Sequence, residues 1–178
     1  MNHYKSWAGL KKQLEDFLCD EYKGRISYFL TRYHKVHDSY GRAAICMDGK
    51  ELVCFSWIEM YRQEADLHEM WSKNGEWDYE NKELKEKWDT DCTYYEMDFL
   101  DATLTFLNLS IKEALESDNY IIKILAIMDR RLGKRTLKKI VDEKKYQEYP
   151  EWVRQFFELR LKGENNETTT TYGHKELR

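Results

Sequence analysis

Proline and glycine are scarce in this chain. Its 178 residues include one proline, Pro150, and eight glycines. A β-sandwich made of many short strands needs such residues at most of its turns. Their scarcity argues against that architecture and favours helices.

Sequence features that would indicate export or membrane insertion are also missing. The first residues contain no apolar run of the signal-peptide type, and no stretch of about 18 apolar residues could span a membrane. The four cysteines, Cys19, Cys46, Cys54 and Cys92, include no CxxC pair. We therefore expect a cytoplasmic protein with reduced thiols and no membrane partner.

No catalytic motif is found. The chain lacks GxSxG, HExxH, P-loop and GxGxxG patterns. A metal site can be considered at four residues on neighbouring predicted strands: His34, His37, Cys46 and Cys54. However, two histidines three residues apart on a strand face opposite sides, and the ligand spacings of zinc sites are absent. We expect a protein without enzymatic activity, metal or other cofactor.

Charge and aromatic content suggest what the surface does. The formal net charge of −4 argues against a protein that coats nucleic acid, because such proteins carry an excess of lysine and arginine. Aromatic residues make up 15% of the chain. Such a content is typical either of a binding interface or of a core bordered by tyrosine and tryptophan side chains whose polar groups remain in contact with water. Region 57–101 holds the candidate interface aromatics Trp71, Trp77, Trp88, Tyr94 and Tyr95.

The periodicity of the first third predicts one helix and a small sheet. Residues 6–19 place their apolar side chains at helical spacing, and Ser6 can cap the start. Segment 25–56 alternates like strands and contains Asp48-Gly49, a strong hairpin signal. We expect a three-stranded antiparallel meander over this segment.

The remainder is predicted to be helical. The pattern begins at Trp57. The best apolar stripe of the stretch 79–117 is made of Phe99, Thr103, Phe106, Leu107, Ile111 and Leu115. This stretch is one helix or two, because residues 78–91 are very polar. Another helix follows Pro150. The predicted fold is α+β, with the small meander packed against a helical bundle in a single domain, 1–162. Residues 163–178 are polar and of low complexity, so we expect a disordered tail.

The segment 127–140, "IMDRRLGKRTLKKI", carries six basic residues between Asp129 and Lys139. The apolar residues before and after Gly133 lie on different sides of a continuous helix, so we predict a helix ending near Leu132, a turn, and a second helix from Lys134. Arg130 and Arg131 would then sit at the negative end of the first helix dipole.

Lys134 and Arg135 would sit at the positive end of the second helix, where an anion should compensate them. The compensating anion is either a carboxylate of this chain or a bound ligand. Within the chain, the candidates are Asp129 and the acidic residues of segment 89–101. The candidate ligands are a phosphate, a nucleic-acid backbone and an acidic protein surface. The candidate anion- or partner-binding residues are Asp129, Arg130, Arg131, Lys134, Arg135 and Lys138.

Two segments of the sequence resemble a known family. They are Trp7 to Lys12, in the pattern Trp-x-x-Leu-Lys-Lys, and Asp129 to Arg135, in the pattern Asp-Arg-Arg-x-Gly-Lys-Arg. The family is an uncharacterised one of small cytosolic bacterial proteins, and the resemblance implies no catalytic residue. We expect a bacterial protein-interaction or inhibitor protein, of an immunity-like kind, with another protein as partner. The alternative is phosphate or nucleic-acid binding through the helix-turn-helix-like segment 120–145.

Overall fold

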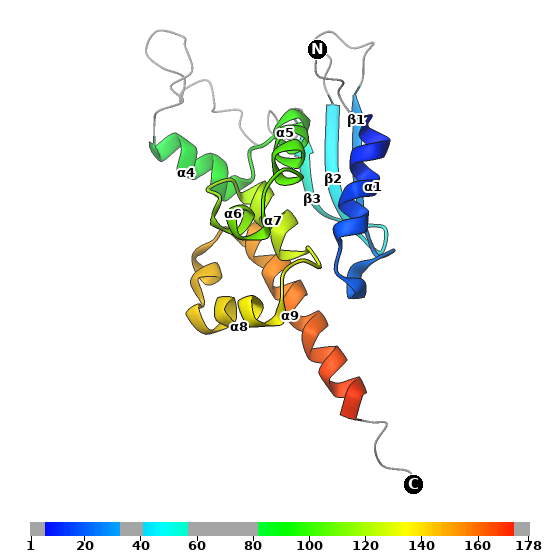
Figure 1. The fold of residues 1–178 in the computed structure, drawn as a ribbon. Helices are drawn as coiled ribbons and strands as arrows, with labels where there is room; N and C mark the ends of the chain where they lie inside the picture. The colour runs from blue at the N-terminus through cyan, green and yellow to red at the C-terminus, as the bar shows by residue number, and fades with distance from the viewer. Residues whose placement is uncertain (1–5, 33–40, 57–81, 173–178) are drawn as a thin grey trace, which may run out of the picture.

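The computed structural model of the protein describes residues 6–32, 41–56 and 82–172 (Figure 1). In chain order the elements are α1 (Trp7–Phe17), η1 (Asp20–Tyr22), β1 (Ile26–Arg32), β2 (Gly41–Met47), β3 (Lys50–Ser56), α4 (Lys82–Asp91), α5 (Glu96–Phe106), α6 (Ile111–Glu116), α7 (Tyr120–Ile127), α8 (Lys134–Glu143), η2 (Lys145–Glu148) and α9 (Glu151–Tyr172), where η marks a short 3-10 helix. The predicted α+β class is confirmed.

The three strands form the predicted antiparallel meander, in the order β1-β2-β3. Asp48 and Gly49 join β2 to β3 with φ angles of 51° and 78°. Both angles are positive, as a two-residue turn with the twist of a hairpin requires. Arg25 forms an ion pair with Asp48 at 2.6 Å, which fastens the start of β1 to this turn.

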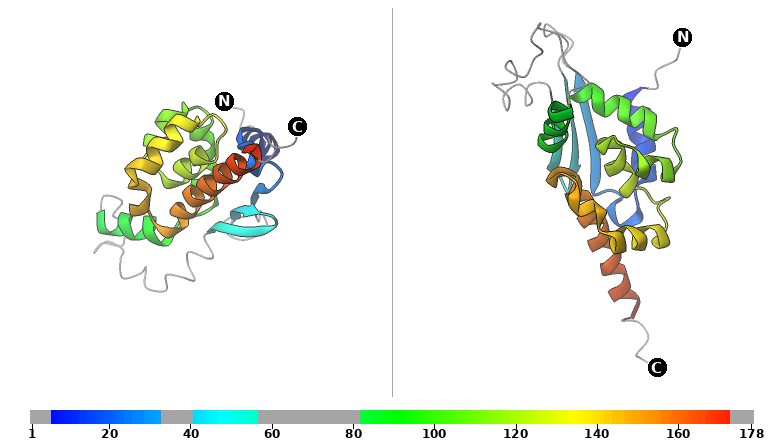
Figure 2. Two further views of the ribbon diagram at one scale, coloured as in Figure 1. Left: turned by 90° about the horizontal axis from the view of Figure 1, so that it is seen from below. Right: turned by 90° about the vertical axis from the view of Figure 1, so that its left-hand side faces the viewer.

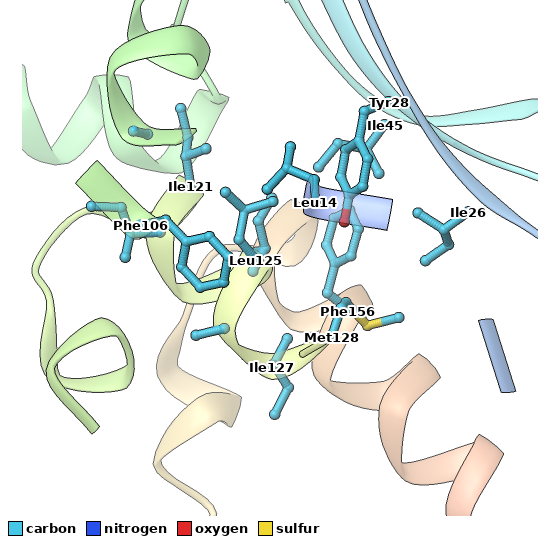
Figure 3. Close-up of a cluster of buried hydrophobic side chains, with 14 of the residues drawn as sticks. Leu14, Ile26, Tyr28, Ile45, Phe106, Ile121, Leu125, Ile127, Met128 and Phe156 are labelled. Carbon is cyan, nitrogen blue, oxygen red and sulfur yellow. The ribbon is translucent and has the colours of Figure 1, made fainter. Parts of the chain in front are cut away.

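Helices α1 and α5 pack against one face of the sheet, and α7 lies behind them (Figures 1 and 2). Phe99 of α5 stacks on Phe55 of β3, with ring centroids 5.2 Å apart. In α7 every residue from Ile121 to Ile127 is buried. Figure 3 shows side chains of the sheet, α1, α5, α7 and α9 meeting in one hydrophobic cluster. This core fixes the positions of the remaining helices.

The two terminal helices begin where local chemistry predicts. Ser6 caps α1, because its side-chain oxygen accepts a hydrogen bond from the backbone N–H of Gly9. Helix α9 follows Pro150 and contributes Val153 and Phe156 to the core. It continues through Tyr172, into the segment for which the sequence predicts disorder, and Figure 1 shows its last part projecting beyond the other elements.

The expectation of one or two helices over 79–117 is wrong. The described residues of this stretch form three helices, and α5 ends at Phe106, within the predicted apolar stripe. Ser110 starts α6 through a capping box: its hydroxyl accepts from the N–H of Glu113, and the Glu113 carboxylate accepts from the N–H of Ser110. This reciprocal cap satisfies both backbone groups and breaks the continuous helix.

Some expectations lie outside the described residues. They concern Trp71, Trp77, His34, His37 and the helical pattern that begins at Trp57. Within the ranges that are described, no helix combines the length and the apolar character needed to cross a membrane.

Candidate interaction site on helix α8

Helix α7 ends at Ile127, so the predicted end near Leu132 is wrong. Its start is as predicted, because Asn119 caps it by accepting from the N–H groups of Ile121 and Ile122. The chain leaves the helix after Ile127 to pair with the residues that follow α1. The N–H of Cys19 donates to the carbonyl of Met128 at 2.9 Å.

A second bond completes this link. The N–H of Arg130 donates to the carbonyl of Phe17 at 2.7 Å, so that Leu18 and Asp129 form an isolated antiparallel bridge. Leu132 is still buried although it is no longer helical. The helical spacing of apolar residues therefore continues to Leu132, although the helix ends at Ile127. For this reason the sequence pattern predicts the end of the helix too late.

Asp129 and Arg131 form an internal ion pair. The Asp129 carboxylate is fully buried; it accepts from the backbone N–H of Arg131 at 2.7 Å and from its Nε at 2.8 Å. The Arg131 guanidinium lies 4.2 Å from the ring centroid of Phe17 and 5.5 Å from that of Phe106. The expected stabilisation of Arg130 and Arg131 by a helix dipole is wrong, because α7 ends at Ile127 and its last turn contains no basic residue.

The predicted second helix is confirmed as α8. Gly133 is its N-cap and offers no side-chain hydrogen bond, and the first turn contains no acidic residue. The side chains of Lys134, Arg135 and Lys138 are exposed, and so is that of Arg130 in the turn before the helix. Within this basic segment Arg131 pairs with the buried Asp129, and Lys139 pairs with Glu143 of the same helix at 3.6 Å, although most of the basic side chains are exposed.

One side of α8 combines basic and apolar character. Leu137 is buried and holds the helix to the core. The sequence pattern groups Val141 with Leu137 on a core-facing side, but Val141 is 37% exposed. Lys134, Lys138 and Val141 follow one another at i, i+4 and i+7 and so lie along one side of the helix. The exposure of Val141 could not be predicted, because its spacing also fits a buried position.

The acidic segment considered as an internal partner is largely engaged elsewhere. Asp89 pairs with Lys85 at 2.8 Å, and Asp91 pairs with Lys87 at 3.2 Å, both within α4. Asp98 accepts from the backbone N–H of Tyr95 at the start of α5. Burial raises the pKa of Asp98, which lies close to two other carboxylates.

The described candidate interface aromatics are half-buried. Tyr94 donates its hydroxyl hydrogen to Asp89, and its ring centroid lies 5.9 Å from that of Trp152. Tyr95 is the N-cap residue of α5. These contacts give Tyr94 and Tyr95 structural roles, whereas the interface role of region 57–101 stays a prediction.

The thiols occupy different environments. Cys46 and Cys54 are half-buried on the sheet, whereas Cys19 is buried. Burial raises the pKa of the Cys19 thiol to about 12, although the nearby Arg160 cation opposes this shift. Across the described ranges, no three histidine, cysteine or acidic side chains gather as metal ligands would.

A contact between the ends of the fold was not predicted. Arg160 of α9 pairs with Glu21 of η1 at 3.0 Å, and the Tyr22 hydroxyl donates to the carbonyl of Leu159. Arg160 is only 4% exposed. The sequence contains one indication of this contact: Arg160 falls among the apolar residues of its helix, and a buried arginine needs a buried partner.

A family model described as the SF0329 protein family matches residues 6–161. The match begins at the N-cap of α1 and ends inside α9, so it includes the Asp129–Arg131 pair and all of α8. It agrees with the resemblance to an uncharacterised family. No curated protein and no solved structure matches the chain.

Proposed function

The chain belongs to the SF0329 protein family, and we propose that it is a non-enzymatic binding protein that contacts an acidic surface of another protein through α8. Its place of action would be the bacterial cytoplasm. An inhibitor or immunity-like role follows if the bound surface includes the partner's own active site.

The observation that carries this proposal is the composition of the exposed side of α8. Lys134 and Lys138 lie beside Val141, one of the more exposed large apolar side chains in the described part of the chain. Protein interfaces combine an apolar centre with a polar or charged rim. The uncapped helix start and the absence of acidic residues in its first turn favour a negatively charged partner.

Two observations favour a protein over a nucleic acid. A nucleic acid carries a far higher density of negative charge than an acidic patch on a protein, so the net charge of −4 opposes its approach more strongly. In addition, Arg131, which would strengthen a phosphate site, is committed to the buried Asp129 carboxylate. Phosphate or nucleic-acid binding through Arg130, Lys134, Arg135 and Lys138 remains the alternative hypothesis.

Site-specific photo-crosslinking in the native host tests the proposal. A photoreactive amino acid replaces Val141 in one variant and the exposed Lys112 of α6 in a control. We expect a discrete protein adduct from position 141, absent from position 112 and lost when Lys134→Glu and Lys138→Glu are added. The same adducts at both positions, or adducts that survive the charge reversal, would contradict the proposal.

Oligonucleotide binding tests the alternative. The purified protein is titrated into labelled single-stranded and double-stranded DNA at low salt. Affinity that falls steeply with salt and is lost in Arg135→Glu would replace the protein partner with a nucleic acid. We expect no binding that depends on Arg135.

A further inference from the structure

A pocket lies between α4 and the junction of η2 with α9. Its volume is about 380 Å³, within the range of small-molecule sites. One wall is a single face of α4, on which Lys82, Lys85, Glu86 and Asp89 follow at helical spacing. The opposite wall includes Tyr120, the first residue of α7, with Glu148 and Tyr149.

The pocket exists because α4 is attached to the rest of the protein at its C-terminal end. The indole N–H of Trp152 donates to the carbonyl of Asp89 at 2.7 Å, and the Tyr94 hydroxyl donates to the Asp89 carboxylate. Toward the start of the helix, Lys82, Lys85 and Glu86 are exposed. Figure 1 shows this first part of α4 pointing away from the helices around α7.

The charges that line the pocket do not cancel. Lys85 and Asp89 compensate each other at 2.8 Å. Lys82 is then left with two glutamates, Glu86 on α4 and Glu148 on η2. The ion pairs of α4 join Lys85 to Asp89 and Lys87 to Asp91, and neither Glu86 nor Glu148 takes part in an ion pair among the described residues. The pocket therefore carries an excess negative charge shared between its two walls.

Aromatic rings adjoin these carboxylates. The ring centroids of Tyr120 and Tyr149 lie 5.6 Å apart. Burial raises the pKa of both phenols, so both are neutral near pH 7. The face of a neutral tyrosine ring attracts cations. Tyr149 already does so within the chain, because the Lys123 ammonium lies 5.6 Å from its centroid.

We infer that this pocket binds an organic cation, an ammonium or guanidinium group held between Glu86 and Glu148 and against Tyr120. The cation is either a free small molecule or the lysine or arginine side chain of a partner. The two sources share one recognition chemistry, in which carboxylates neutralise the charge and an aromatic face contacts the apolar stem. The inference does not depend on the role of α8.

Nuclear magnetic resonance titration tests this inference with three probes. Agmatine represents the free cation, and N-acetyl-arginine amide represents an arginine side chain in a polypeptide. N-acetyl-citrulline amide, which is neutral and of nearly the same shape, is the matched control. We expect the cations to shift the ring signals of Tyr120 and Tyr149 and citrulline to leave them unchanged. Tighter binding of agmatine would indicate the free small molecule, and equal or tighter binding of the arginine amide a partner's side chain.

Charge-neutralising variants locate the site. Glu86→Gln and Glu148→Gln should each weaken cation binding by about fivefold, because each removes one partly screened attraction. Asp91→Asn, on α4 but outside the pocket, is the control with the same charge change and should bind normally. Unchanged binding in both glutamine variants, binding of citrulline as tightly as arginine, or binding of inorganic phosphate but no cation would overturn the inference.

Discussion

The buried carboxylate of Asp129 holds the Arg131 guanidinium over the ring of Phe17. This carboxylate accepts from both the backbone N–H and the Nε of Arg131, whose partly exposed guanidinium lies 4.2 Å from the ring centroid of Phe17. Arg130 is exposed, while its backbone N–H donates to the carbonyl of Phe17, the last residue of α1. One dipeptide therefore supplies both a structural contact and a surface charge.

Arg131→Met should destabilise the protein because it leaves the Asp129 carboxylate buried without its cation. We expect a loss of about 2–3 kcal/mol in the free energy of unfolding, somewhat less than for fully buried pairs. The reduction reflects the Arg131 side chain, which is 34% exposed. Urea denaturation measures the difference. Arg130→Met is the matched control and should change stability by less than about 0.5 kcal/mol; equal losses in the two variants would contradict the assigned roles.

Cys19 should resist alkylation in the folded protein. The thiolate is the reactive form, and burial raises the pKa of Cys19 to about 12 while leaving the side chain 2% exposed. Native-state labelling with iodoacetamide at about pH 8, followed by peptide mass spectrometry, should modify Cys46 well before Cys19. Labelling of Cys19 at the rate of Cys46 would show that the junction after α1 opens readily.

Gly41→Ala should be far more costly than Gly133→Ala. An added Cβ at position 41 would lie 2.5 Å from the carbonyl oxygen of Thr31 and 2.6 Å from Cγ of Glu96, whereas at position 133 it would meet nothing within 4 Å. We expect losses of about 1–3 kcal/mol at position 41 and a few tenths at position 133. Thermal unfolding compares the two variants, and similar midpoints would contradict this close approach of α5 to the sheet.

Lys123 should make stability depend on pH in the alkaline range. Burial lowers the pKa of its ammonium, although Asp118 and Glu116 oppose this shift. Between the folded and unfolded pKa values the unfolded chain binds more protons, so the contribution of Lys123 to the free energy of unfolding rises with pH.

The wild type should therefore gain stability relative to Lys123→Met as pH increases from about 7 to about 10. The midpoints of urea denaturation at several pH values measure this difference. The contributions of titrating groups that both proteins share cancel in the comparison. Parallel profiles for the two proteins would contradict the lowered pKa.

Features governed by neighbouring residues could be predicted from the sequence. The Asp48-Gly49 turn, the Ser6 and Asn119 caps and the start of α8 each depend on backbone chemistry within a few residues. The capping box of Ser110 and Glu113 follows the same local rules, but the apolar stripe from Phe99 to Leu115 runs across it and suggests a longer helix.

Features that depend on distant residues could not be predicted. Helix α7 ends early because its following residues bond to the segment after α1, more than a hundred positions earlier in the chain. The Arg131 guanidinium has its position because the rings of Phe17 and Phe106, distant in sequence, provide a surface for it. The pocket beside α4 depends on the hydrogen bond from Trp152 that attaches this polar helix to the rest of the protein. The spacing of apolar residues along the chain cannot predict that attachment.

The bonds from Glu21 and Tyr22 to α9 have a consequence for synthesis of the protein. These early residues find their partners only after α9 has been synthesised. Arg160, which is buried, pairs with Glu21 and lies 139 positions further along the chain. This part of the fold therefore closes only when α9 is present, and a nascent chain without α9 exposes the apolar surface that this helix covers to chaperones and proteases.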